Sequence, residues 1–239
     1  MLLILLLPAC VSAVDDTAEL KKRLQERFRD LTITEVRPAP VAGLYEVVFG
    51  TRVALVSADG NYLITGDLID LASERNISAE RRAKLVLDTL VARTGEKNMI
   101  VFGPAKAKRT ITVFTDVDCP YCRKLHGEVA ALNQAGVQVR YLLYPRAGQG
   151  SETYKRSVAI WCAKDRKQAA STALAGGKLE MKTCQHPVDE HLKLGTEIGV
   201  SGTPTIVLDD GRIAPGYVPA AQILDVLGLK DGEPAAATR

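Results

Sequence analysis

The chain has 239 residues, 46% of them hydrophobic and 25% charged, and 31 basic residues against 28 acidic ones give a formal net charge of +3. So small a positive excess gives no reason to expect a nucleic-acid partner. A phosphate-binding glycine loop, a Ser-His-Asp pattern and an internal repeat are all missing from the sequence, so nucleotide-dependent chemistry and serine hydrolysis are not expected.

The N-terminus predicts an exported protein. Its apolar run, Leu2 to Leu7, is far too short to cross a bilayer, which takes about 20 residues. Val11-Ser12-Ala13 resembles a signal-peptidase site, so we expect a signal peptide over residues 1–13 and a mature chain from Val14. The segment Leu7 to Cys10 also resembles a lipoprotein cleavage site, but its proline is unusual there. Simple cleavage, which removes Cys10, is the favoured interpretation.

Residues 14–73 have the pattern of a small α+β domain. A helix is expected from Asp16, with Leu20, Leu24 and Phe28 on one face. Strands are expected at residues 33–37, 44–49, 52–56 and 62–65, separated by turn residues. Such a domain buries too little surface for a monomer to be expected, and pairing with a second copy would cover its strand edges. The pattern therefore favours a dimer.

A second helical pattern covers residues 78–93, with Ala83, Leu87, Leu90 and Val91 on one side. Gly95 ends it, and residues 99–102 read as a strand that begins another domain.

Residues 110–114 form an apolar strand that leads into the motif Cys119-Pro120-Tyr121-Cys122 at the start of a helical pattern. A helix N-terminus carries partial positive charge and free N–H groups, which favour a thiolate over a thiol. We expect Cys119 at the N-cap and Pro120 at the first helical position. Cys119 is then the nucleophile, and Cys122, one turn further on and more buried, is the resolving thiol.

Half of a structural zinc site is the alternative interpretation of a C-x-x-C motif. A site that combined Cys119 and Cys122 with Cys162 and Cys184 would be irregular, and the strand-then-helix context favours redox chemistry. We therefore expect no metal and no cofactor. His126 shares a helix side with Cys122 and could influence its field, but a packing role is more typical.

The rest of the chain continues the alternation of strands and helices. A strand is expected at residues 137–144, helices at 151–175, 188–198 and 220–227, and a disordered tail at 231–239. Gly202-Thr203-Pro204 precedes a strand that runs to Leu208, and its proline suits either the beginning of a strand or a tight cis turn.

Two stretches resemble the thioredoxin fold and, more closely, the periplasmic disulfide isomerase family that includes DsbC and DsbG. They are F-T-D-V-D-C-P-Y-C-R-K-L-H at residues 114–126 and G-T-P at residues 202–204. The resemblance implies a cis Pro204 that faces the C-x-x-C motif, with Thr203, Pro204, Pro120 and Tyr121 contacting the substrate.

For the whole chain the resemblance implies an α+β fold in three parts. They are a cystatin-like dimerisation domain at 14–73, a linker helix within 74–97 and a thioredoxin-like catalytic domain with a helical insertion at 98–230. The family forms a V-shaped homodimer with an apolar cleft between its arms.

Cys162 and Cys184 are the cysteines left once Cys10 and the motif are set aside. In an oxidising compartment they should form a disulfide, although the spacing alone does not exclude two free buried thiols. The family has a structural disulfide in this part of the domain, which many DsbG-like members lack.

The expected function is rearrangement of wrong disulfides in exported proteins, in the periplasm, with re-reduction by a membrane protein like DsbD. Three alternatives remain open. The dipeptide Pro120-Tyr121 is the form associated with DsbG, a chaperone and reductase that favours folded partners with single oxidised cysteines. A DsbA-like monomeric oxidant would leave the N-terminal domain unexplained, and a non-catalytic chaperone would not depend on thiols at all.

Overall fold

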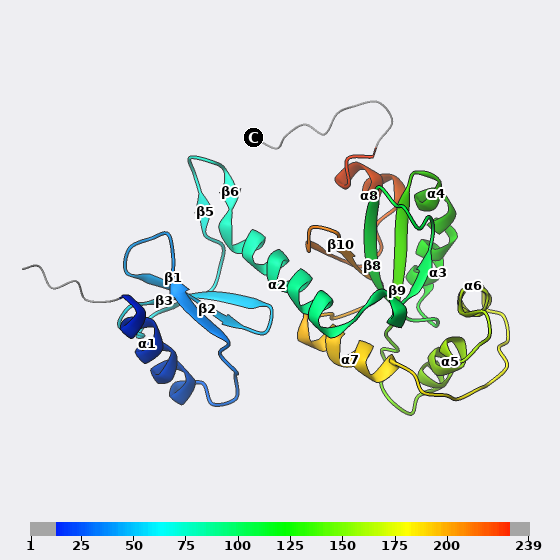
Figure 1. The fold of residues 1–239 in the computed structure, drawn as a ribbon, viewed down its shortest axis with the longest axis horizontal. Helices are drawn as coiled ribbons and strands as arrows, with labels where there is room; N and C mark the ends of the chain where they lie inside the picture. Colours follow the sequence, from blue (N-terminus) through cyan, green and yellow to red (C-terminus); the bar gives the residue numbers. More distant parts are fainter. Residues whose placement is uncertain (1–12, 230–239) are drawn as a thin grey trace, which may run out of the picture. The chain divides into compact units, whose positions relative to one another are not determined.

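The computed structural model describes residues 13–229, which divide between Asp67 and Leu68 into two compact units (Figure 1). The expected signal peptide up to residue 12, with Cys10, and the expected disordered tail lie outside the described residues. Within the described range, none of the helices is both long and apolar enough to cross a membrane.

The N-terminal unit packs one helix on an antiparallel sheet with strand order β1-β2-β3-β4. Its elements are α1 (Ala13–Arg27), β1 (Glu35–Pro38), β2 (Leu44–Phe49), β3 (Arg52–Ser57) and β4 (Leu63–Ile64). Leu20 and Leu24 of α1 are buried against Val47 and Val56 of the sheet, as the periodicity predicts. The helix begins at Ala13, before the expected Asp16, and the fourth strand is shorter than expected.

The C-terminal unit begins with a short hairpin and a long helix. These are β5 (Ile69–Asp70), β6 (Arg75–Asn76) and α2 (Ile77–Arg93). The side chain of Asn76 caps α2 by accepting a 2.8 Å hydrogen bond from the Ala79 N–H. Ala83 and Leu90 are buried as expected, but Val91 is 80% exposed, so the buried face is narrower than predicted. The hairpin was not predicted, because two-residue strands leave no alternation to detect.

A mixed five-stranded sheet forms the centre of this unit, with strand order β11-β10-β8-β9-β7. After the short 3₁₀ turn η1 (Glu96–Asn98), its strands are β7 (Ile100–Phe102), β8 (Arg109–Thr115), β9 (Val137–Leu143), β10 (Thr205–Leu208) and β11 (Ile213–Pro215). Strands β8 and β9 are parallel, and the other pairs are antiparallel.

Helices cover both faces of this sheet (Figure 1). They are α3 (Pro120–Gly127), α4 (Val129–Gln134), α5 (Glu152–Trp161), α6 (Arg166–Leu174), α7 (Val188–Glu197) and α8 (Ala220–Val226). Val113 and Tyr141 face the larger core, which α3 to α6 and α8 complete. Phe114 and Leu142, the next residues along β8 and β9, face the smaller core with α2 and α7.

Two helical patterns are broken where the sequence predicted continuous helices. The pattern over residues 151–175 splits into α5 and α6, because the Asp165 side chain accepts a 3.0 Å hydrogen bond from the Gln168 N–H and begins a new helix. The pattern after the C-x-x-C motif splits at Glu128 into α3 and α4. Apolar spacing continues across both breaks, so periodicity alone does not reveal them.

Candidate active site

Strand β8 and helix α3 place the two motif cysteines at a helix N-terminus. Cys119 is the N-cap of α3, and Pro120 occupies the first helical position, as the sequence predicts. The Cys119 N–H donates a 3.1 Å hydrogen bond to the Asp116 carbonyl, which closes the turn between strand and helix. The free N–H groups and the dipole of α3 therefore favour negative charge at this end of the helix.

Neither motif cysteine is in a disulfide, and the two sulfurs have different hydrogen-bond partners. The Cys119 thiol donates to the Thr203 carbonyl oxygen at 3.1 Å, and the Cys122 sulfur accepts from the Asp116 N–H at 3.5 Å. Each cysteine is 1% exposed, so exposed area does not separate them. The Cys122 sulfur is nevertheless enclosed by more protein than the Cys119 sulfur, as expected.

The loop before β10 brings a cis proline to the cysteines. The peptide bond between Thr203 and Pro204 is cis, and both residues are buried. The Thr203 hydroxyl is one of the buried side-chain atoms that have no hydrogen-bond partner within the described part of the chain. Since it lies beside both sulfurs, this hydroxyl is free to donate to a thiolate once one forms.

The electrostatic surroundings separate the two thiols. Burial works to raise the pKa of Cys119, but the Thr203 hydroxyl and the N–H groups at the start of α3 outweigh it, and the pKa lies below its ordinary value. At Cys122 burial dominates and raises the pKa to about 11. Cys119 is therefore the thiol that ionises first, and Cys122 stays protonated.

A buried carboxylate and an arginine lie next to the cysteines. Asp116 is 2% exposed and accepts hydrogen bonds from the Arg146 backbone N–H at 2.9 Å and from its Nε at 3.0 Å. It also accepts from the Thr153 hydroxyl at 2.8 Å and from the Asp118 N–H at 2.9 Å. Burial alone would raise the pKa of Asp116, but these donors hold it below its usual value.

Sequence reasoning missed this ionic pair. Asp116 fixes the Arg146 guanidinium, and the charge of that group interacts with both cysteines. A positive charge near a thiol favours the thiolate. Asp116 stands inside the motif that carries the family resemblance, but nothing local points to an arginine 30 residues further on.

His126 packs between three elements, in agreement with the role that its position in the sequence favours. Its Nδ1 lies 3.0 Å from the Tyr141 hydroxyl, and its Nε2 lies 3.0 Å from the Ser171 hydroxyl. Burial lowers its pKa, which favours the neutral ring. The ring thus links α3 to β9 and α6.

The other two cysteines among the described residues are paired with each other. Cys162, the C-cap of α5, forms a disulfide with Cys184, with Cα atoms 5.7 Å apart. This pairing is inconsistent with the zinc site considered above. In the part of the chain that the structure describes, three or more His, Cys, Asp or Glu side chains are nowhere grouped in a way that could hold a metal ion.

Of the four residues expected to contact the substrate, two are buried and two are exposed. Thr203 and Pro204 form the buried floor beside Cys119, and Pro120 and Tyr121 are exposed, the latter by 61%. All four lie at the start of α3 or in the loop that it faces.

Two protein families match separate parts of the chain. The disulfide bond isomerase protein N-terminal domain matches residues 11–79, and the thioredoxin-like domain matches residues 96–229.

Curated proteins and a solved structure are similar to the chain over much of its length. The thiol:disulfide interchange protein DsbC of Escherichia coli strain K12 is 39% identical over 81% of this chain and 80% of that protein. The protein of the same name from Haemophilus influenzae is 35% identical over 93% of this chain and 95% of that protein. The crystal structure of a disulfide interchange protein from Neisseria gonorrhoeae is 30% identical with a TM-score of 0.51, and it covers 59% of this chain and 100% of that one.

Proposed function

The chain belongs to the DsbC family of thiol:disulfide interchange proteins, and from this premise we propose that it is an isomerase and reductase that corrects wrong disulfides in exported proteins. The contrast between its two motif thiols carries the proposal. Cys119 has a lowered pKa and Cys122 a raised one. Near neutral pH Cys119 is therefore the thiol that can attack as a thiolate, and Cys122 stays protonated.

The first step is nucleophilic attack. The Cys119 thiolate attacks one sulfur of a substrate disulfide, forms a mixed disulfide with it and releases the other substrate sulfur as a thiolate. The substrate segment lies along Thr203 and Pro204 in an extended conformation. Backbone hydrogen bonds there would accept many sequences, as a general isomerase requires.

The mixed disulfide can then be resolved in two ways. In isomerisation the freed substrate thiolate attacks elsewhere in the substrate, and a later thiolate displaces Cys119, with no net change in oxidation state. In reduction Cys122 gives up its proton and attacks the Cys119 sulfur. The substrate leaves reduced by two electrons, and the motif becomes a disulfide. A membrane reductase like DsbD would return those electrons.

The rest of the proposal concerns location and assembly. The working division is a dimerisation domain at 14–73, a linker helix within 74–97 and a catalytic domain at 98–230. The protein acts in the periplasm as a homodimer, joined through its N-terminal domain, and its partners are misoxidised exported proteins.

A DsbG-like role is the second candidate. The Pro120-Tyr121 dipeptide supports it, and the Cys162–Cys184 disulfide supports the DsbC-like role instead. A DsbG-like protein would act as a chaperone and would reduce single oxidised cysteines in folded partners.

Recovery of activity from a scrambled multi-disulfide protein tests the proposal. Wild type should restore activity, Cys119→Ser should not, and Cys122→Ser should accumulate mixed disulfides that gel electrophoresis without reductant reveals. Full reductase turnover by Cys122→Ser would contradict the assigned roles. Equal recovery with Cys119→Ser would indicate a non-catalytic chaperone, and failure of folded wild type would favour the DsbG-like candidate.

A further inference from the structure

Tyr217 contacts a stripe of side chains on the outer face of the active-site helix. Its ring centroid lies 6.4 Å from that of Tyr121, with an angle of 26° between the ring planes. The Lys124 Nζ lies 4.5 Å from the Tyr217 centroid, over the ring, and the Tyr217 hydroxyl donates to the Glu128 carboxylate. Positions 121, 124 and 128 follow helical spacing, so one aromatic side chain is held along the stripe.

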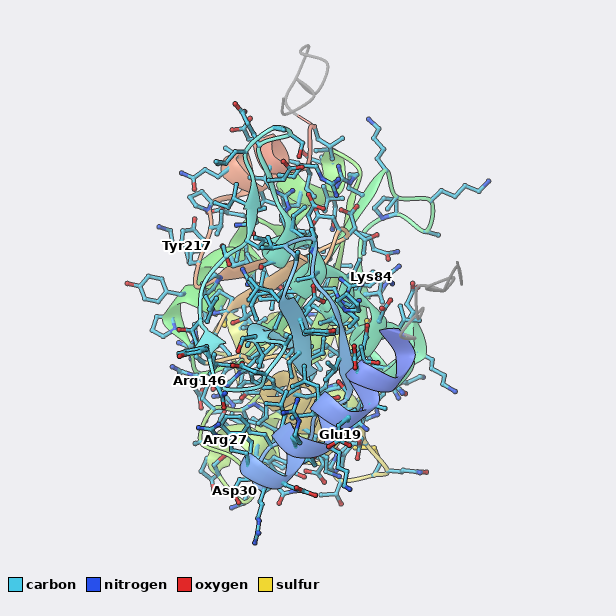
Figure 2. All side chains as sticks on the ribbon, turned by 90° about the vertical axis from the view of Figure 1, so that its left-hand side faces the viewer. Glu19, Arg27, Asp30, Lys84, Arg146 and Tyr217 are labelled. Atoms are coloured by element: carbon cyan, nitrogen blue, oxygen red, sulfur yellow. A yellow bond between two sulfur atoms is a disulfide. The ribbon has the colours of Figure 1, made fainter. Side chains whose placement is uncertain are left out.

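The backbone next to Tyr217 is hydrogen-bonded to the cis-proline loop. The N–H of the preceding residue, Gly216, donates a 2.8 Å hydrogen bond to the Pro204 carbonyl. Glu128 also accepts from the Ala220 N–H at 2.5 Å, which holds the carboxylate in place. Tyr217 therefore bridges the two elements that form the site, α3 and the loop before β10. Figure 2 labels it near the same edge of the view as Arg146.

The surface formed by Tyr121 and Tyr217 is called the tyrosine platform here. It is apolar and aromatic, and the Tyr121 ring is 61% exposed. The Glu128 carboxylate at the Tyr217 hydroxyl and the Lys124 ammonium over the Tyr217 ring place one negative and one positive charge beside the rings. Aromatic rings pair favourably at centroid separations of about 4.5–7 Å, so a further ring could extend the platform.

A substrate bonded to Cys119 comes close to this surface. Its sulfur is bonded to Cys119, two residues before Tyr121, and an extended chain advances only about 3.3 Å per residue. A side chain directly next to the attacked cysteine therefore lies within reach of the platform.

We propose, building on the thiol exchange proposed above, that the tyrosine platform is a subsite for an aromatic side chain next to the attacked cysteine of the substrate. Lys124 and Glu128 hold the Tyr217 ring in place. Misfolded proteins expose aromatic residues that folded proteins bury, so the subsite would direct attack toward misfolded partners.

The test uses the reduced full-length protein and short peptides in which Trp, Leu, Ala or Lys stands directly before or after one cysteine. That cysteine is activated as a mixed disulfide with a chromophoric thiol, which is released when Cys119 attacks. Each rate is divided by the same variant's rate with oxidised glutathione, which removes changes in general reactivity. Wild type should favour Trp over Ala by about threefold to tenfold, mainly through KM.

Three variants locate the preference. Tyr217→Leu should reduce the Trp-to-Ala ratio toward one, and Tyr217→Phe should largely keep it, because the ring remains when the hydroxyl bond to Glu128 is lost. Tyr62→Leu, at a 71% exposed tyrosine of the N-terminal unit, is the matched control and should match wild type.

A wild type without preference for Trp, or an unchanged ratio in Tyr217→Leu, would overturn the subsite. Absence of exchange with oxidised glutathione in wild type is a different outcome, because it would refute the proposed thiol chemistry and the subsite with it.

Discussion

The Cys119 thiol and the Thr203 carbonyl oxygen, 84 residues apart in the sequence, are joined by a hydrogen bond of 3.1 Å. This contact fixes the sulfur against the residue that precedes the cis proline. The nucleophile is therefore positioned by two separate segments, the start of α3 and the loop before β10. Changes in either segment, or in the charges around them, should alter its reactivity.

The two motif thiols should ionise far apart on the pH scale. In the reduced protein, the ultraviolet absorbance of thiolate should rise in a first step below the ordinary thiol pKa, and Cys122, with its pKa raised to about 11, should stay protonated through that step. Cys119→Ser should remove the first step, and Cys122→Ser should keep it. If the first step survives in Cys119→Ser, the low pKa does not belong to Cys119.

Loss of the Arg146 charge should weaken the nucleophile. Arg146→Met removes a cation that favours both thiolates, so the pKa of Cys119 should rise and its attack near neutral pH should slow. Because this guanidinium is partly exposed, the effect should be about twofold to fivefold. Arg212→Met, which removes an exposed charge paired with Asp210 in the turn before β11, is the control. Equal rates of attack by wild type and Arg146→Met would show that α3 and Thr203 suffice to lower the pKa of Cys119.

The Cys162–Cys184 disulfide should stabilise the fold. It joins residues 22 apart in the sequence, and loop-closure entropy gives roughly 3 kcal/mol for a loop of this size. The double variant Cys162→Ala/Cys184→Ala should lower the free energy of unfolding in urea by about that amount. The double variant Cys119→Ala/Cys122→Ala loses as many cysteines but keeps the disulfide. Equal stability of the two would mean that the cross-link contributes nothing.

Gly211 should tolerate no side chain, for a reason beyond its backbone conformation. Its φ is +86°, and a Cβ there would lie 2.0 Å from the Ala83 carbonyl oxygen of α2. Gly199 has a similar φ of +83° but has open space around it. Gly199→Ala should cost about 1–2 kcal/mol for the left-handed backbone. Gly211→Ala should cost at least about 1 kcal/mol more in the same urea titration, because the turn must move off α2.

Similar losses of unfolding free energy in the two glycine variants would contradict this close contact between α2 and the turn from β10 to β11.

His191 should make the protein sensitive to mild acid. Its ring is 1% exposed, accepts from the Leu143 N–H at 3.1 Å and lies 2.8 Å from the Asn98 carbonyl, which suits the neutral form. Burial lowers its pKa from 6.5 to about 4. The unfolded chain therefore binds the proton first, and stability should fall as the pH drops from 6.5 to about 4, by up to about 3 kcal/mol.

His191→Gln should be less stable than wild type at neutral pH, with a flatter pH dependence over that window. An unchanged acid slope in urea titrations of His191→Gln would show that another group causes the loss.

Features that depend on neighbouring residues could be predicted from the amino-acid sequence alone. Cys119 and Pro120 begin a helix because the N-cap and the first helical position are set within one turn. The alternation along residues 137–144 and the spacing of Leu20 and Leu24 likewise predicted β9 and the buried face of α1. Periodicity could not reveal the break at Asp165, since apolar spacing continues across it.

Which distant groups surround the sulfurs depends on how the strands and helices pack together. Arg146 reaches Asp116 because parallel pairing brings the ends of β8 and β9 together. Tyr217 reaches the stripe on α3 because β11 pairs with β10 beside the cis-proline loop. A local pattern fixes the φ and ψ angles of a segment, whereas the distance between side chains far apart in the sequence depends on strand order and helix packing, which no short stretch encodes.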